Sequence, residues 1–119
     1  MPDDFTMDPI RELIELCESL DPPLSVSMDP QDLNPPAGWI ALDEVRAANL
    51  AGGITLRTSL YLIAPDVDPE RSLTQLVPIF QQLRAAGVKP DGPVTTIGVV
   101  LPGDPTPLPA LRVPIDLTT

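Results

Sequence analysis

Residues 54–64, ITLRTSLYLIA, form the clearest strand signal in the chain and decide the class of fold. Apolar side chains recur at every second position, so one face of a strand carries Ile54, Leu56, Leu60 and Leu62, together with Thr58. The opposite face carries Thr55, Arg57, Ser59, Tyr61 and Ile63. Such alternation is typical of a strand with one face in a core and the other half wet, as in an antiparallel sheet.

Four further segments predict strands, namely residues 24–28, 38–47, 94–101 and 108–117. The second of them places Trp39 and Ala41 on one face and Ile40 and Leu42 on the other. In the last segment Pro114 has no N–H to donate to a ladder, which favours an edge position for that strand.

Two helices are predicted from their start signals. Residues 8–20 open with Asp8 as N-cap and Pro9 at the first helical position, and Asp68 and Pro69 repeat the device later. The first apolar stripe is Ile10, Leu13, Ile14, Cys17 and Leu20, and the second is Leu73, Leu76, Val77, Phe80 and Leu83. Gly87 favours a stop for the second helix. Pro78 should kink that helix, unless the helix begins later in the chain.

The resulting order, α-β-β-β-α-β-β, predicts one α+β domain over residues 1–119. We expect an antiparallel or mixed sheet of about five strands, with both helices packed on one face. Residues 1–7 are expected to form a loose lead-in.

Charge narrows the classes of partner. The net charge is -10, from 17 acidic and 7 basic residues, which argues against binding to a nucleic-acid backbone or an anionic membrane surface. Residues 1–34 hold nine of the acids and one base, Arg11. That segment is either a solvated face, or a surface that repels a polyanion or docks a basic partner. No apolar run has the length of a membrane span and no signal peptide is evident, so we expect a soluble protein made in a cytoplasm.

The sequence offers little for catalysis. Histidine is absent, and the single cysteine, Cys17, falls on the apolar stripe of the first helix, where a buried structural thiol is expected. The carboxylate pairs Asp29–Asp32 and Asp66–Asp68 sit at turns or helix caps, where aspartate is favoured for backbone hydrogen bonding. We therefore expect a protein that is not an enzyme, with no cofactor and no metal.

The stretch SMDPQDLNPPAGWIAL, residues 27–42, is the candidate functional segment. Prolines pre-order it, so docking against a partner would cost little conformational entropy. The candidate protein-contact residues of this stretch are Asp32, Leu33, Asn34, Pro35, Pro36 and Trp39. Trp39 either anchors a contact with a neighbouring subunit or packs under the helices of its own domain.

Two motifs carry a family resemblance: LNPPAGWI, residues 33–40, and YLIAP, residues 61–65. With the closing LPALRVPIDL, they make the chain resemble, over nearly its whole length, the small tail terminator proteins of long-tailed phages that infect actinobacteria. The family pattern after LNPP is Cys or a small residue and then a β-branched or aromatic pair. This chain departs mildly, with Ala37, Gly38, Trp39 and Ile40.

The resemblance implies a structural role in the virion. Such proteins form a homohexameric ring on the head-proximal end of the tail tube, stop tube growth and offer a surface to the neck. The implied partners are other copies of the chain, the major tail tube protein and a head-completion or neck protein. Assembly would take place in the host cytoplasm. DNA would only pass through the lumen, whose carboxylates would repel phosphates. The alternatives are a head-closure or tail-completion neck protein, and a small non-viral binding or enzyme domain.

Overall fold

The computed structural model describes residues 8–20, 23–47, 53–103 and 105–118. The elements are α1 (Asp8–Glu18), β1 (Ser25–Ser27), the 3-10 helix η1 (Pro30–Asp32), β2 (Ala37–Ala47), β3 (Ile54–Ile63), α2 (Pro69–Ala85), β4 (Thr95–Val99) and β5 (Leu108–Thr118). The predicted order and the α+β class are confirmed. The predicted lead-in, residues 1–7, lies outside the described residues.

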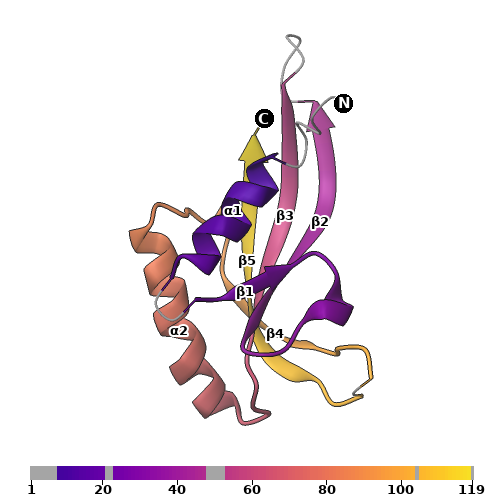
Figure 1. Cartoon of the computed structure of the whole chain (residues 1–119), viewed down its shortest axis with the longest axis vertical. Helices are drawn as coiled ribbons and strands as arrows, with labels where there is room; N and C mark the ends of the chain where they lie inside the picture. Colours follow the sequence, from indigo (N-terminus) through magenta and orange to yellow (C-terminus); the bar gives the residue numbers. More distant parts are fainter. Residues whose placement is uncertain (1–7, 21–22, 48–52, 104, 119) are drawn as a thin grey trace.

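One five-stranded mixed sheet organises the domain, in the order β1-β2-β3-β5-β4 (Figure 1). β1 pairs parallel with β2, and every other pairing is antiparallel. In the central pairing Trp39 lies opposite Tyr61 and Ile40 opposite Leu60. A bulge between Leu42 and Glu44 then shifts the register of β2. Because of the extra residue, the alternation of β2 side chains between the two faces of the sheet changes at this point.

Both helices cover the same face of the sheet, as predicted (Figure 1). β3 sends Leu56, Leu60 and Leu62 into this core, each with no exposed area. β2, β5 and the helices supply the rest of its fully buried large side chains: Ile40, Val113, Ile10, Cys17, Leu76 and Leu83. Among the described helices, none has the length and apolar character needed to span a membrane.

The buried stripe of α2 differs from the predicted one. Leu73 and Val77 are 40% and 39% exposed, whereas Ser72 is fully buried in line with Leu76 and Leu83. The Ser72 hydroxyl donates a hydrogen bond to the carbonyl of Asp66 at 2.8 Å, which removes the cost of burying a polar group. A prediction based on apolarity alone therefore places the buried face of α2 on the side of the larger residues Leu73 and Val77.

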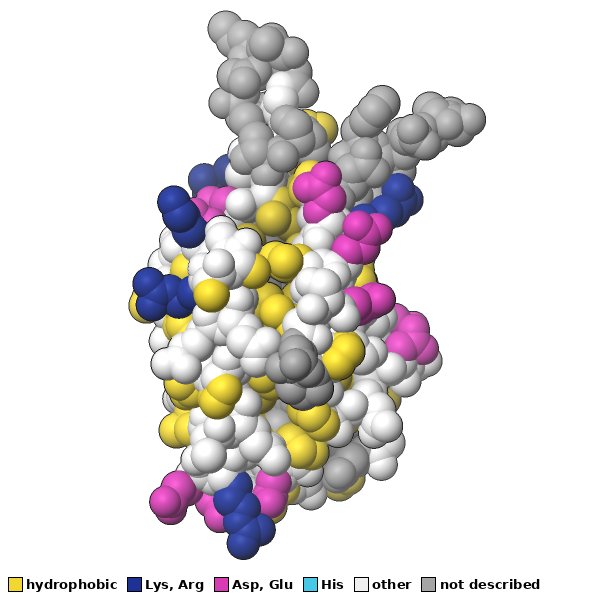
Figure 2. Space-filling model, turned by 60° about the vertical axis from the view of Figure 1, so that its left-hand side comes forward, with side chains coloured by type: hydrophobic (Ala, Val, Ile, Leu, Met, Phe, Trp, Pro, Cys, Tyr) yellow, Lys and Arg dark blue, Asp and Glu magenta, His cyan; other side chains and the backbone are white. Residues whose placement is uncertain are grey.

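On the side of the molecule that α2 covers, charged side chains lie mainly around the margin (Figure 2).

The ends of α2 follow the sequence signals. Asp68 caps the N-terminus and accepts the N–H of Glu70, with Pro69 in the first turn. Pro78 lies inside the helix and is exposed, so the alternative of a later start is wrong. Gly87 follows the last turn with a φ of 103°, the left-handed conformation that favours glycine at a helix end.

The prediction that β5 is an edge strand is wrong, because β5 lies between β3 and β4. Its ladder with β4 ends at the pair Arg112–Thr95, however, so Pro114 lies beyond the reach of β4. The carbonyl of Pro114 accepts the N–H of Asp91 at 2.8 Å on that side. Pro114 is thus at a local edge within an interior strand, and its missing donor costs no ladder bond.

Gly38 supplies a test of the packing between β1 and β2. A Cβ at Gly38 would lie 2.8 Å from Cγ2 of Val26 on the neighbouring strand β1. We expect Gly38→Ala to lower the free energy of unfolding by about 1–3 kcal/mol, measured by urea denaturation. Val26→Ala removes the clashing methyl, so the double variant should lose less than the sum of the two single losses. Simple additivity would contradict this account of the close approach.

Candidate functional site

Of the paired carboxylates, those of Asp29, Asp66 and Asp68 accept a nearby backbone N–H, as predicted. Asp29 caps η1 by accepting the N–H of Gln31 at 2.9 Å. Asp66 accepts the N–H of Asp68 at 2.9 Å, and this bond, with a weaker one from Arg71, lowers the pKa of the Asp66 carboxyl below its usual value. Among the described residues, no three His, Cys, Asp or Glu side chains come together in a way that could hold a metal ion.

Cys17 is fully buried on α1, as expected for a structural thiol. Burial, and secondarily the charge of Glu18, raises the pKa of the Cys17 thiol to about 11. The thiol is therefore protonated at neutral pH, and a protonated buried thiol is a poor nucleophile.

The proline loop, residues 28–36, is a connector with its own internal order. Because β1 and β2 run parallel, the loop must bring the chain back from the end of one strand to the start of the other. Ser27 accepts the N–H of Asp29 at 3.0 Å, and Asp32 donates its N–H to the Asp29 carbonyl at 3.0 Å. The Pro35–Pro36 peptide bond is cis and leads directly into β2. The loop is thus held by short local bonds and by fixed proline φ angles.

Trp39 lies on the face of the sheet opposite the helices. Its ring stacks on Tyr61, with centroids 5.0 Å apart and planes at 24°. Its indole N–H donates to the carbonyl of Met28 at 3.2 Å. The alternative that Trp39 packs under the helices is therefore wrong, because its neighbour Ile40 takes that side. Trp39 is partly buried, so one part of the side chain packs while another stays accessible.

A second apolar cluster gathers around Trp39 on this helix-free face. Its buried members are Ile63, Val99 and Ala110, and the partly buried side chains around them are Leu33, Trp39, Tyr61, Leu101 and Leu108. Beside it lies a groove of about 330 Å³, lined by Pro30, Gln31, Leu33, Asn34, Pro35, Pro65, Leu101, Pro102, Thr106 and Leu108. Three loops, after β1, β3 and β4, therefore meet at one end of the sheet.

The predicted interface residues fall into two groups. Leu33, Asn34 and Pro35 line the groove, and Leu33 and Trp39 share the second cluster. Asp32 and Pro36 are exposed and lie outside the groove lining. The sequence missed the contributions of the other two loops, which are Pro65 from one and Leu101, Pro102, Thr106 and Leu108 from the other. Their only signal was proline and leucine placed just beyond strand ends.

The other half of the helix-free face is charged. Arg57 lies 3.8 Å from Glu44 and 3.5 Å from Asp116, and Arg46 bonds to Glu44 at 2.8 Å. The hydrogen bond from Arg46 is the main cause that lowers the pKa of the Glu44 carboxyl. In addition, Arg112 lies 3.7 Å from Asp43. Such exposed pairs contribute little stability, but they leave this half with balanced charge inside a strongly acidic chain.

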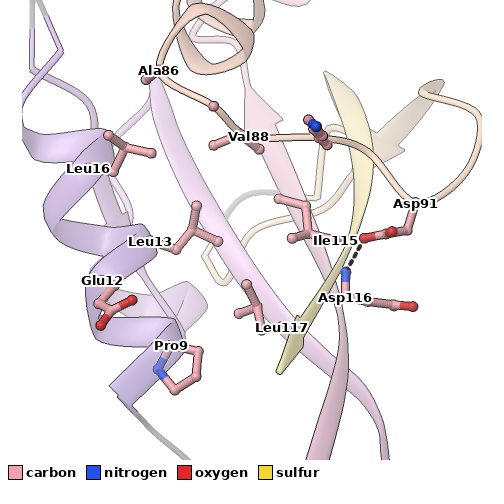
Figure 3. Close-up of a pocket in the computed structure, with 12 residues that line it drawn as sticks. Pro9, Glu12, Leu13, Leu16, Ala86, Val88, Asp91, Ile115, Asp116 and Leu117 are labelled. Atoms are coloured by element: carbon pink, nitrogen blue, oxygen red, sulfur yellow. Dashed lines mark hydrogen bonds between the residues drawn. The ribbon is translucent and has the colours of Figure 1, made fainter. Parts of the chain in front are cut away.

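A second cavity, of about 400 Å³, opens between α1, the segment after α2 and the end of β5 (Figure 3). Its floor is aliphatic: Leu13, Leu16, Val88, Ile115 and Leu117. Asp91 at its edge already accepts the N–H of Asp116 at 2.5 Å. The cavity thus has an aliphatic floor, and the charged residues Glu12, Lys89, Asp91 and Asp116 complete its lining.

Truncation of Trp39 tests the second cluster. Because the side chain is only partly buried, Trp39→Ala should lower the free energy of unfolding by roughly 2 kcal/mol, below the ~3–5 kcal/mol of a fully buried aromatic. Trp39→Phe keeps a ring against Tyr61 and loses only the indole donor, so its loss should be near ~1 kcal/mol. Urea denaturation followed by circular dichroism measures both. Equal losses for the two variants would contradict a stabilising role for the stacked ring.

The Cys17 thiol gives a second test. A pKa raised from 9.0 to about 11 lowers the thiolate fraction at pH 8 by a factor of ~100. Labelling of the folded protein by a disulfide reagent should therefore be at least that much slower than labelling in urea. Equal rates in the two solutions would show that Cys17 is accessible in the native state.

The chain matches no protein-family model, no curated protein and no solved structure at a significant level.

Proposed function

We propose that the protein is a ring-forming structural subunit of a phage tail, a tail terminator that caps the head-proximal end of the tail tube. The observation that carries the proposal is where the two resemblance motifs lie. Trp39 of the first motif is the register partner of Tyr61 of the second, and their rings stack. Pro35 and Pro65, one from each motif, line the same groove.

This convergence supports a protein-binding surface. The groove lining has no charged side chain, and five of its ten residues lie in the proline loop. Fixed proline φ angles leave little conformational freedom to lose on docking, which favours affinity. A partly buried tryptophan beside such a groove is typical of interface anchors. In the proposal this surface contacts the tube or the neighbouring subunit.

The distribution of acids supports an orientation of the subunit in the ring. Glu12, Glu15 and Glu18 are exposed on α1, whereas Arg46, Arg57 and Arg112 on the helix-free face are paired with acids. We place the α1 side toward the lumen, where carboxylates repel the phosphates of passing DNA. The proposed role needs no cofactor and no membrane.

Two other functions are the alternatives to the terminator. A head-closure or tail-completion neck protein would also present an apolar groove to a partner, but its partner would lie on the head side. A small non-viral binding or enzyme domain would require a ligand in one of the two cavities. The terminator is favoured because both resemblance motifs contribute to one surface.

Capping of tail tubes tests the proposal. Purified protein should form rings and bind one end of isolated tail tubes, as seen by negative-stain electron microscopy and by mass in solution. Asn34→Arg places a long charged side chain at the groove and should reduce end binding at least ~10-fold, because an unpaired charge in an apolar contact is costly. Gln81→Arg makes the same change in charge on an exposed position of α2 and is the matched control.

The outcomes separate the candidates. Loss of end binding in Asn34→Arg but not in Gln81→Arg would support the terminator and place the groove in the contact. A protein that forms no ring and binds no tube end would overturn it. Binding to filled heads in place of tubes would favour a neck protein. A ring whose lumen is lined by arginines, with the α1 acids on the outer rim, would contradict the proposed orientation.

A further inference from the structure

The two outer edges of the sheet are protected to different degrees. At one edge, the part of β2 that extends past the short strand β1 carries a bulge at Leu42/Glu44 and the charged residues Asp43, Glu44 and Arg46. Bulges and charges are the usual devices that stop an edge strand from pairing with another chain. β4, the opposite edge, has neither. Residues 92–103 hold no charged side chain, and the prolines lie only at the ends of this segment.

The pairing of β5 fixes which backbone groups of β4 point outward. The carbonyl of Pro109 accepts the N–H of Ala64 at 3.0 Å, so the backbone groups of Pro109 point toward β3. In a strand these groups alternate between sides, so those of Ala110 point toward β4. Ile97 is the register partner of Ala110 and therefore bonds to β5. The residues on either side of Ile97 turn their N–H and C=O groups away from the sheet.

Those two residues are Thr96 and Gly98, and both are exposed. Within the described part of the chain, nothing outside the sheet ladder forms a hydrogen bond with either of them. Ile97 between them is 42% exposed on the helix-free face, next to the second apolar cluster. The edge thus offers backbone donors and acceptors together with an uncovered β-branched side chain.

We infer that β4 pairs with β4 of a second copy of this chain, antiparallel about a two-fold axis at Ile97, to form a continuous sheet across two copies. The segment is complementary to itself in this register. Thr96 of one copy lies opposite Gly98 of the other, so each such pair exchanges two backbone hydrogen bonds, and the axis makes two pairs. Ile97 lies opposite Ile97 of the partner subunit in a non-hydrogen-bonded pair, where side chains approach most closely.

Charge argues for a second copy as the occupant of this edge. With a net charge of -10, two copies repel each other over most of their surfaces. The segment 92–103 lets them approach without bringing like charges together. A basic partner would gain nothing at this edge and would be drawn to the acids elsewhere. The contact is two-fold, whereas ring closure needs a heterologous interface, so this inference is independent of the proposed tail function.

Cross-linking tests the register directly. Paired Cα atoms in a non-hydrogen-bonded antiparallel pair lie at a distance that a disulfide can bridge. Ile97→Cys should therefore form a covalent dimer under mild oxidation, seen on a non-reducing gel. Val45→Cys places a thiol on the protected edge at a comparably exposed position, 53% against 42% for Ile97, and should stay monomeric on the gel. The native Cys17 is buried and should not cross-link.

Sedimentation equilibrium tests the strength of the contact. Before rings assemble, the protein should form a species of twice its 12.7 kDa mass at micromolar concentration. Ile97→Lys should raise the dissociation constant at least ~100-fold, because it brings two ammonium groups together, while Val45→Lys on β2 should leave it unchanged. Thr96→Pro removes an outward N–H and should weaken the dimer similarly. Circular dichroism reports folding of each variant, and Ile97→Lys decides the matter if Thr96→Pro unfolds.

Two results would overturn the inference: dimers that persist unchanged in Ile97→Lys, or absence of both dimer and Ile97→Cys cross-link at high protein concentration. These readouts do not involve tail tubes. A protein that dimerises through β4 but never binds tube ends would refute only the tail function, and a tube-binding protein without the cross-link would refute only the β4 pairing.

Discussion

The rest of the structure depends on β3, because it is paired along both sides and has buried side chains on both faces. β2 and β5 pair with it over nearly its whole length. Leu60 points into the core under the helices, and Ile63 points into the second cluster on the opposite face. Sliding β3 by one residue would exchange these faces and expose both sets. The hydroxyl of Thr58 donates to the carbonyl of Ile115 at 2.7 Å, so a polar position within the core also fixes this register.

Element order and fold class could be predicted because they depend on local sequence patterns. The period of two in β3 and the Asp-Pro starts of both helices report on single elements without tertiary information. The errors concern choices that only packing makes. Ser72 is buried in place of Leu73 because Asp66, from the preceding loop, supplies a hydrogen-bond acceptor. Pro114 lies in an interior strand because β4 is too short to reach it, and no local pattern encodes the length of a partner.

The candidate site was half predictable for the same reason. The proline loop is recognisable by composition, so the sequence predicts Leu33, Asn34 and Pro35 as site residues. Their groove partners come from the loops after β3 and β4, and nothing within the proline loop specifies which loops close over it. Side chains along a strand alternate between the two faces of the sheet. Because Gly38 and Ile40 lie on the face covered by the helices, Trp39 between them lies on the opposite face. This alternation alone, however, does not say which face the helices cover.

Charge placement ties the two proposed surfaces together. On α1 the carboxylates stand exposed, while the charged half of the helix-free face is neutralised by its own ion pairs. The groove and the β4 edge carry no charged side chain at all. In a chain this acidic, contact between copies costs least where charge is absent, because bringing like charges together is unfavourable. The acids therefore restrict association to a few surfaces, and the backbone of β4 and the shape of the proline groove specify what can bind there.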